Sequence, residues 1–514
     1  MTHLALSALA PLLLLAAALA FLSRPGRRPG ALPRLAEGAA LAALACAAAG
    51  VVQLLLAGPQ VVRLGDTGLM RLDPVGATMA LLVAFVGWVV VRYARRYLDG
   101  EAHEGTFHGM TLAAIAAVLV LVQAASLPVM IAAFVATGLI LHRLLLFYPD
   151  RAEARRAAAK FIRVWGAGDV ALILAAVLFW QGLGTVDLAA LNGAGALPLA
   201  AQVGIGFVVL AATLKCAAFP VHGWLTEVME APTPVSALLH AGIINAGGVL
   251  LITLSGLVQQ SPGAMAALVM IGGFTALFGA LVMLTQSAVK TALAWSTVSQ
   301  MGFMLLQCGL GLWALALLHI VAHALYKAHA FLSSGGAVQA VNAIRKPGPV
   351  AVPGAGAVLR SFGLALVLYG LVAAGFTALV GEKSAQALAL GAILIFGVSY
   401  LIAQGLADAA PGALTQRTLA ASAATALAYF GFHVAAEALW GPALPAAPVP
   451  GALEWALIVL AVASFGLVAF AQALFPLWAH HPATAGLRVH LANGLYLNAL
   501  LDRVIGGFRS PARS

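Results

Sequence analysis

Long apolar stretches recur along almost the whole chain of 514 residues, separated by short polar segments rich in Arg, Pro and Gly. Each stretch is about 18 to 25 residues long, which lets a helix cross a hydrocarbon core of roughly 30 Å. The stretches are too long and too uniformly apolar to be the strands of a membrane barrel. The pattern therefore predicts an all-α membrane protein with about 13 to 15 transmembrane helices.

The predicted helices follow from the limits of these stretches. They lie at residues 4–22, 36–57, 75–93, 109–125, 127–147, 161–181, 199–230, 233–258, 264–286, 291–309, 311–334, 356–380, 385–406, 414–440 and 451–479. The first has no basic segment before it and is followed by several arginines. We therefore interpret it as a retained helix rather than a cleaved signal peptide.

Composition and charge agree with a lipid environment. Hydrophobic residues make up 62% of the chain and charged residues only 9%, a balance that a water-soluble surface of this size does not tolerate. Lys and Arg collect in alternate connections, as expected on the cytoplasmic side of an inner membrane. This pattern places the N-terminus outside and the C-terminus in the cytoplasm. It also accounts for the net charge of +10 without nucleic acid as a partner.

Several kinds of chemistry find no support in the sequence. Cys46, Cys216 and Cys308 lie singly in apolar stretches, without the paired spacing of an iron–sulfur or zinc site. No Gly-rich phosphate loop or nucleotide fingerprint precedes a predicted helix. We expect neither a metal nor another cofactor in this chain, and no redox reaction or ATP hydrolysis by the chain itself.

Two basic residues, Lys215 and Lys327, lie inside apolar stretches rather than between them. A charge at the bilayer centre costs at least about 2.5 to 3.5 kcal/mol, so it indicates a functional site. Lys215 precedes Pro220, Pro232 and Pro234, which each remove a backbone donor and disfavour continuous helix. We predict a broken helix that lines a hydrated cavity beside Lys215. A lysine that reaches to the membrane surface is the alternative.

Burial lowers the pKa of a lysine toward the range where it can release a proton, and a nearby carboxylate raises it again. The candidate partners of Lys215 are Asp169, Glu227 and Glu230. Asp169 also follows a basic segment, so a structural pair with Arg163 is an alternative role for it.

The segment HIVAHALYK places His319, His323 and Lys327 at intervals of four residues. On a helix these side chains form a slanted row, each about 6 Å further along the axis. Imidazole suits proton relay because its pKa lies near neutrality, and waters must bridge gaps of this size. A histidine packed against a carbonyl is the alternative for either ring alone. The three residues together predict a proton relay.

Two weaker candidates complete the set. His240 lies in the stretch 238–251, where Gly242, Gly247 and Gly248 indicate close helix packing that brings His240 toward the helix of Lys215. Lys290 falls at the start of a stretch, where a capping or surface-reaching lysine is an equally good interpretation.

Two features near the C-terminus stay open between two interpretations. His433 and Glu437, four residues apart, either extend a proton path or hydrogen-bond each other. The amphipathic stretch 487–508 either lies in the membrane interface or docks a partner.

Three of these segments carry a family resemblance. APTPVSALLHAGIINAGGVLL (231–251), ALAWSTVSQMGFM (292–304) and HIVAHALYKAHAFLSSG (319–335) resemble the core motifs of the proton-conducting subunits of complex I and of Mrp-type sodium/proton antiporters. The resemblance covers roughly residues 110–340.

This resemblance implies an architecture and a pathway. The chain would contain two inverted repeats of five helices, each with a broken helix. The expected parts are N-terminal helices at 1–108, repeats at 109–258 and 259–410, C-terminal helices at 411–479 and a cytoplasmic amphipathic tail at 480–514. The residues that match family positions for the proton pathway are Lys215, His240, Lys290, His319, His323 and Lys327.

The chain departs from the complex I pattern at two places. Val135 stands where those subunits carry the glutamate that partners the lysine. A charged group is also not evident inside the second broken helix, because Glu382 and Lys383 fall in a predicted external connection.

A narrower resemblance accommodates these departures. The motifs LHAGIINAGG and HALYKAHAFLSSGG, the run at 138–161 and the segment VHLANGLYLNALLDR resemble DabB subunits, the membrane subunits of two-part inorganic carbon pumps. The resemblance implies a DabA-like soluble zinc partner on the cytoplasmic side. That partner would hydrate carbon dioxide to bicarbonate, driven by cation flow, so this chain would be a transport subunit and not an enzyme. The alternatives are a subunit of a redox-driven proton pump, a sodium/proton antiporter, or a scaffold with vestigial charges.

Overall fold

The computed structural model describes residues 5–334, 354–405, 412–474, 478 and 481–505. Among these residues, 11 helices are long and apolar enough to cross a membrane. The described chain is helical apart from one small hairpin. The expected all-α membrane fold is confirmed.

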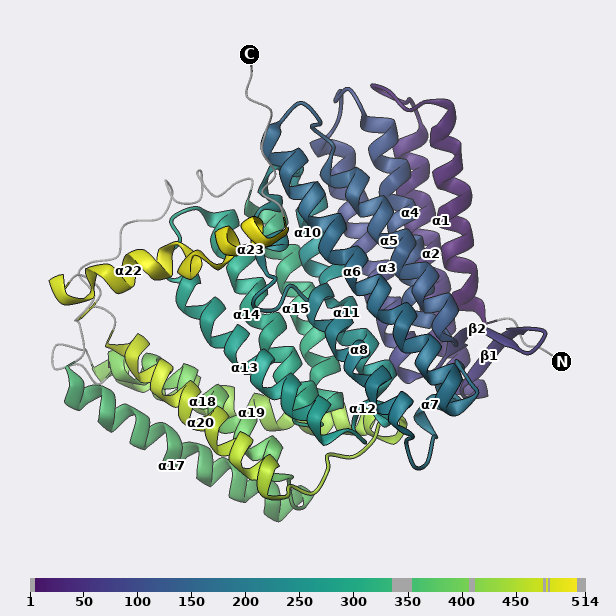
Figure 1. Cartoon of the computed structure of the whole chain (residues 1–514). Helices are drawn as coiled ribbons and strands as arrows, with labels where there is room; N and C mark the ends of the chain where they lie inside the picture. The colour runs from purple at the N-terminus through teal and green to yellow at the C-terminus, as the bar shows by residue number, and fades with distance from the viewer. Residues whose placement is uncertain (1–4, 335–353, 406–411, 475–477, 479–480, 506–514) are drawn as a thin grey trace.

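The long helices up to residue 333 stand side by side in one bundle (Figure 1). They are α1 (Leu9–Ala20), α2 (Leu32–Ala57), α3 (Pro74–Tyr97), α4 (Glu104–Gln123), α5 (Leu127–Leu145), α6 (Ala152–Leu183), α8 (Leu199–Lys215), α13 (Pro262–Met283), α14 (Val289–Gly309) and α15 (Trp313–Ser333). One continuous apolar core runs through these helices, from α1 to α15.

Shorter elements and a C-terminal group complete the chain. The short helices are α7 (Leu188–Asn192), α9 (Gly223–Thr226), α10 (Thr233–Ala241), α11 (Ala246–Thr253), α12 (Ser255–Val258), α22 (Ala485–Ala492) and α23 (Leu497–Ile505). The C-terminal group consists of α17 (Ala355–Val380), α18 (Ala385–Gly405), α19 (Gly412–Trp440) and α20 (Ala452–Ala473). Separate apolar clusters join these four helices to one another and to α13–α15.

Local signals set several helix boundaries. The Asp73 carboxylate accepts the backbone N–H of Gly76 at 2.6 Å and caps α3, whose first residue is a proline. Helix α13 begins in the same way, after Ser261 and with Pro262 at its first position. Helix α6 ends at Gly184, whose φ of +68° is the left-handed conformation that glycine adopts readily.

Glycines on both helices allow α13 and α14 to pack in close contact. A Cβ added at Gly272 or Gly279 of α13 would meet the backbone of α14, and one added at Gly302 or Gly309 would meet the backbone of α13. Small residues are the usual means of close helix packing in membranes, where hydrophobic attraction between helices is absent.

The broken helix predicted after Lys215 is confirmed. Helix α8 ends at Lys215, and the chain turns through α9 and a 3-10 turn, Val228–Glu230, before α10 begins. The span predicted at 233–258 is present as Thr233–Thr253, but it is divided into α10 and α11. A 3-10 turn, Ile243–Asn245, separates α10 from α11, and Gly242 lies at the junction without a side chain to favour helix.

A second feature that the sequence analysis did not predict is a β-hairpin. Strands β1 (Gln60–Leu64) and β2 (Thr67–Leu72) pair antiparallel, with Gln60 opposite Leu72. The hairpin follows α2 at one end of the bundle (Figure 1). Its strands are too short to stand out among the long apolar stretches that surround them.

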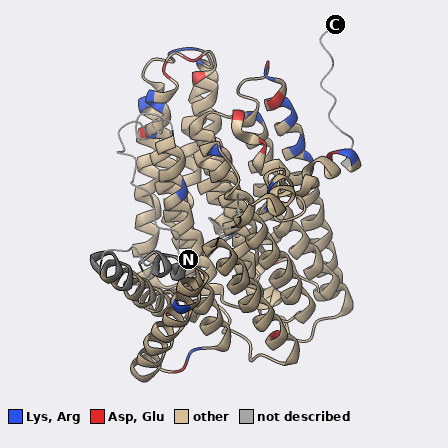
Figure 2. Ribbon diagram, turned by 90° about the vertical axis from the view of Figure 1, so that its left-hand side faces the viewer, with Lys and Arg blue, Asp and Glu red and all other residues tan. Residues whose placement is uncertain are grey.

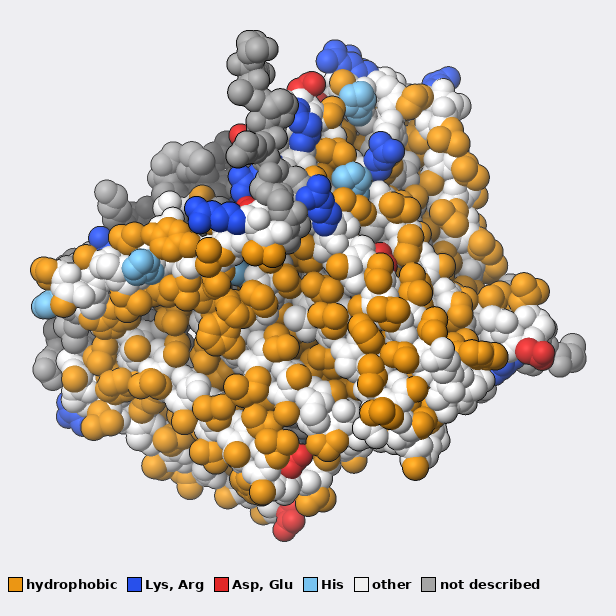
Figure 3. Space-filling view, in the orientation of Figure 1, with side chains coloured by type: hydrophobic (Ala, Val, Ile, Leu, Met, Phe, Trp, Pro, Cys, Tyr) orange, Lys and Arg blue, Asp and Glu red, His pale blue; other side chains and the backbone are white. Residues whose placement is uncertain are grey.

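Charged side chains gather mainly at one end of the bundle, as Figure 2 shows. We call this end the basic end. It contains the α1–α2, α3–α4 and α5–α6 connections, with Arg28, Arg95, Arg96, Arg151, Arg155 and Arg156. Hydrophobic side chains cover the flank between the two ends in the view of Figure 3, as expected of a surface that faces lipid.

Candidate proton pathway

Lys215 lies at the last residue of α8, where the broken helix begins, and its side chain is fully buried. Its Nζ donates to Asp169 Oδ1 at 2.6 Å and lies 3.4 Å from the carbonyl oxygen of Trp165. Helices α6 and α8 pack along each other, which brings Asp169 to the lysine. Of the three candidate carboxylates, the structure places Asp169 on Lys215.

Aromatic rings enclose the same ammonium group. Lys215 Nζ lies 4.1 Å from the ring centroid of Trp165 and 4.4 Å from that of Phe134. Trp165 Nε1 donates to the Phe134 carbonyl oxygen at 3.1 Å and so ties α6 to α5. A cation over an aromatic face gains roughly 0.5 to 2 kcal/mol, more when it is shielded from water. The rings therefore offset part of the cost of burying the charge.

These contacts supply Lys215 with a carboxylate although position 135 is a valine and not a glutamate. Helix α5 contributes the Phe134 ring to the lysine, and the carboxylate comes from Asp169 on α6. Sequence analysis had no means to rank Asp169 above the other acids, and it did not identify the aromatic rings. The signal for the rings is the position of Trp165, four residues before Asp169 and thus on the same helix face.

The histidine row on α15 occupies the middle of the bundle. His319 Nδ1 lies 2.9 Å from Gln307 Oε1 on α14, and its ring centroid lies 6.1 Å from that of His323. His323 is buried, and neither of its ring nitrogens has a hydrogen-bond partner among the described residues. His319 Nε2 also lacks a hydrogen-bond partner in the described part of the chain, so the two rings do not bond to each other directly and a proton relay between them requires a water bridge.

Lys327 continues this row toward the basic end of the bundle. Its side chain is fully buried, and its Nζ donates to Ser296 Oγ at 2.8 Å and to the Leu293 carbonyl oxygen at 3.0 Å. Both partners belong to α14 and are neutral. Lys327 therefore differs from Lys215, whose charge is balanced by a carboxylate.

His240 lies where α10 meets α14 and α15. Its Nδ1 lies 3.1 Å from Thr297 Oγ1 on α14, and its ring stacks on Phe331 of α15 at a centroid distance of 4.3 Å. Lys327 bonds to Ser296, the residue next to Thr297, so His240 and Lys327 contact adjacent residues of α14.

Gly247 and Gly248 bring helices close together as predicted, whereas Gly242 faces Leu238 of its own helix, and the direction of His240 differs from the prediction. A Cβ at Gly247 would meet Cys216 directly after α8, whereas a Cβ at Gly248 would meet Met304 of α14 and Ile320 of α15. Helix α11 thus packs close to both lysine-bearing helices. His240 itself stacks against α15 and not against α8, because the break at Ile243–Asn245 separates α10 from α11.

The remaining candidates lie apart from this chain of contacts. Glu230 bonds to Arg151 at 2.8 Å, and Glu227 bonds to Lys160 at 2.8 Å. Lys290 is half-buried at the second residue of α14, and the described residues include no hydrogen bond or ion pair for it.

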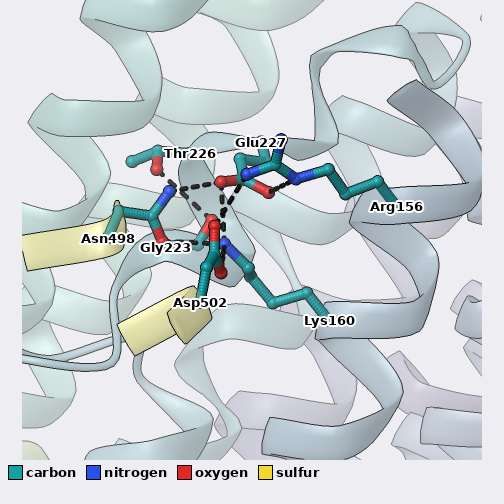
Figure 4. A network of polar contacts seen from close by, with 7 residues as sticks. All are labelled: Arg156, Lys160, Gly223, Thr226, Glu227, Asn498 and Asp502. Carbon is teal, nitrogen blue, oxygen red and sulfur yellow. Dashed lines mark hydrogen bonds and ion pairs between the residues drawn. The ribbon is translucent and has the colours of Figure 1, made fainter. Parts of the chain in front are cut away.

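A charged cluster that the sequence analysis missed surrounds Lys160 (Figure 4). The Lys160 side chain is only 1% exposed and contacts Glu227, Asn498 and Asp502. Arg156 lies beside it and bonds to Asp502. The available signal is spacing, because Arg156 and Lys160 on one helix, and Asn498 and Asp502 on another, are each four residues apart.

Polar residues also meet near the end of the bundle that is opposite the basic end. His433 Nε2 lies 3.7 Å from Glu437 Oε1, so the two side chains form a pair within α19. Glu382 and Lys383 lie between α17 and α18, as predicted. Together with Trp313 at the start of α15, these residues line a pocket.

Comparison with known proteins agrees with this arrangement. Residues 124–346 match the family described as NADH:quinone oxidoreductase/Mrp antiporter, and residues 69–108 match the N-terminal part of complex I chain 5. The probable inorganic carbon transporter subunit DabB2 of Halothiobacillus neapolitanus is 36% identical over 453 residues, which cover 85% of this chain and 81% of that protein.

More distant relatives lie in complex I and Mrp assemblies. NADH-quinone oxidoreductase subunit L of Mycobacterium tuberculosis is 30% identical over 467 residues, covering 86% of this chain and 70% of that protein. A chain of the Mrp complex from Dietzia sp. DQ12-45-1b superposes with a TM-score of 0.62 at 23% identity, covering 98% of this chain and 60% of the Mrp chain. This last likeness concerns the fold alone.

Proposed function

The chain belongs to the DabB family of inorganic carbon transporter subunits, and from this premise we propose that it conducts protons to drive the capture of carbon dioxide. It is a multi-pass membrane protein with an antiporter-like core. In the proposed arrangement it lies in the inner membrane with its basic end in the cytoplasm. A DabA-like zinc subunit binds on that side, and hydration of carbon dioxide to bicarbonate takes place there.

The observation that carries the proposal is the set of buried ionisable groups on α15, α10 and α8. Lys215, Lys327 and His240 are all fully buried. Each buried charge costs several kcal/mol, so lysines retained inside membrane helices indicate a functional site. A scaffold subunit has no need of His323, whose ring nitrogens are buried without a protein partner among the described residues.

Protons follow a defined order in this proposal. They reach His319 from the outer side, pass through His323 and Lys327, and cross by way of His240 to Lys215. Water bridges the gaps between rings. A proton leaves Lys215 only when its 2.6 Å ion pair with Asp169 opens, because the ammonium group is held on that carboxylate. The proton then leaves near Glu227 toward the partner.

A subunit of a redox-driven pump or a sodium/proton antiporter is the second candidate. The family match to complex I and Mrp proteins favours it, since those proteins share the same core. The two candidates differ in what the proton flow drives and in the partner that accompanies the chain.

Growth rescue separates the two candidates. The chain is expressed with a DabA-like partner, and then alone, in a carbonic-anhydrase-deficient bacterium in ambient air, with and without an uncoupler. The proposal predicts rescue that requires both proteins and is lost with the uncoupler. Failure of rescue together with sodium/proton exchange in membrane vesicles would assign the chain to the antiporters.

A further inference from the structure

The C-terminal helix α23 presents its polar side to the protein and its apolar side outward. Asn498 and the buried Asp502 point into the cluster around Lys160, as Figure 4 shows. In contrast, the exposed fraction is 52% for Leu500 and 83% for Val504. Hydrophobic contact alone does not account for this docking, and the polar contacts determine where the helix lies.

Those contacts are short and balanced in charge. Lys160 Nζ lies 2.8 Å from Glu227 Oε1, 2.8 Å from Asn498 Oδ1 and 2.6 Å from Asp502 Oδ1. Arg156 Nη2 lies 2.7 Å from Asp502 Oδ2. Two cations thus face two carboxylates. Loss of either carboxylate leaves an excess positive charge on the fully buried Lys160, which is a costly arrangement.

The same cluster fixes the short helix α9. Asn498 Nδ2 donates to Glu227, the residue that follows α9. A Cβ added at Gly223, the first residue of α9, would overlap the Asn498 amide. Helix α23 therefore rests directly on α9, and the glycine is what allows the contact.

On its other side, α9 contacts the Lys215 site. Trp224 Nε1 donates to the Leu214 carbonyl oxygen at 3.1 Å, next to Lys215. The Trp224 ring meets Trp165 edge-on, at a centroid distance of 6.2 Å and an angle of 89°. Trp165 in turn lies over the Lys215 ammonium group. A displacement of α9 therefore moves the aromatic wall of the lysine site.

We propose that α23 is a gate over the proton exit, in which Asn498, Asp502 and Lys160 position α9 and so keep the Lys215–Asp169 pair covered. The inference rests on the proposed proton conduction and adds residues that act through α9. Asn498, Asp502 and Lys160 are positioning residues, because none of their contacts among the described residues is with Lys215.

The charge balance links gate opening to proton passage. A proton that passes from the Lys215 ammonium to the Glu227 carboxylate, through water, leaves a neutral amine and a neutral carboxylic acid. Glu227 then no longer balances Lys160 and Arg156, so the cluster carries an excess positive charge and its hold on α9 weakens. Release of that proton to the cytoplasm restores the carboxylate and closes the gate.

A reversible tether between α23 and α9 tests the proposal. Gly223→Cys with Asn498→Cys places two sulfurs at the point of overlap, where the β-carbons lie close enough for a disulfide. Proton flux is measured in vesicles that contain the chain and its partner, before and after reduction with dithiothreitol. We expect the oxidised double variant to lose flux and the reduced one to recover it. The single variants control for pairing with the native Cys216 and for the glycine replacement.

A charge variant provides a second test that does not depend on Gly223. Asp502→Asn weakens the docking of α23, so vesicles that contain this chain without its partner should leak protons faster than wild type. Asp502→Glu should return the leak toward the wild-type rate, and Arg503→Gln, at the exposed neighbour, should leave it unchanged.

The outcomes separate the gate from the pathway. If the oxidised double variant conducts as fast as the reduced one, or if Asp502→Asn leaks no faster than wild type, the gate is refuted while proton conduction stands. If wild-type vesicles with the partner carry no proton flux, the proposed function itself fails, and the gate fails with it.

Discussion

Lys215 Nζ lies 2.6 Å from Asp169 Oδ1 at the end of a broken membrane helix. The pair joins α8 to α6, whereas Val135, where the resemblance to complex I subunits predicts a glutamate, lies on α5. A carboxylate on a different helix stabilises the buried ammonium group in the same way, because the stabilisation depends on the nearby negative charge and not on the helix that carries it.

Asp169→Asn should abolish proton flux, because it leaves the Lys215 ammonium buried without a charge partner. Breaking a buried pair in this way costs about 3 to 5 kcal/mol, so a lower melting temperature should accompany the loss. Glu230→Gln is the matched control, since Glu230 pairs with Arg151 and its side chain is 39% exposed. Proton uptake by vesicles and thermal unfolding in detergent check both variants. Equal flux in Asp169→Asn and Glu230→Gln would show that the pair is not needed.

Val135→Glu should partly restore flux to the Asp169→Asn variant. The new carboxylate returns to the family position, next to Phe134, whose ring already contacts the Lys215 ammonium. Val135→Gln in the same background has similar volume without the charge and should restore nothing. Rescue by both side chains would mean that volume, and not charge, matters at this position.

His323→Ala should stop proton flux while the protein still assembles in the membrane, because the row from His319 to Lys327 loses its middle group. His329 offers a control on the same helix, since it is also a histidine but lies exposed on another face of α15. His329→Ala should conduct like wild type. The comparison of initial flux rates at equal protein content decides the matter, and normal flux in His323→Ala would remove this row from the pathway.

His240→Phe should separate packing from proton transfer. The phenyl ring retains the stacking on Phe331, which has a centroid distance of 4.3 Å, but it carries no proton and cannot bond to Thr297. We expect normal yield and thermal stability with flux lost. Thr297→Val, which removes only the hydroxyl partner, should reduce flux less. Wild-type flux in His240→Phe would indicate that protons reach Lys215 by another route.

Hydropathy predicted the long helices to within a few residues in most cases, because a span of lipid imposes both length and composition on a helix. Helix α17, predicted at 356–380, is Ala355–Val380. Proline positions also predicted the break after Lys215. Interruptions shorter than a turn of helix, such as Ile243–Asn245, lack such a signal and were missed.

The pairing of charges depends on tertiary packing, which spacing alone does not reveal. Asp169, Glu227 and Glu230 were equal candidates in the sequence, and only the packing of α6 against α8 selects Asp169. Nothing near Lys160 in the sequence indicates its partners on α23, since Asn498 is 338 residues away. Contacts over such separations arise from the fold and leave little trace in local sequence.

Proton uptake into right-side-out vesicles, with the basic end and the partner facing the lumen, tests the central claim most directly, with wild type compared to Lys215→Met and Lys215→Arg. The account predicts rapid uptake by wild type when an inward proton gradient is imposed and bicarbonate forms. Lys215→Met should show none, because methionine fills the site but carries no proton, and Lys215→Arg should also be inactive, because arginine keeps its proton. Wild-type uptake in Lys215→Met at equal protein content would contradict the account.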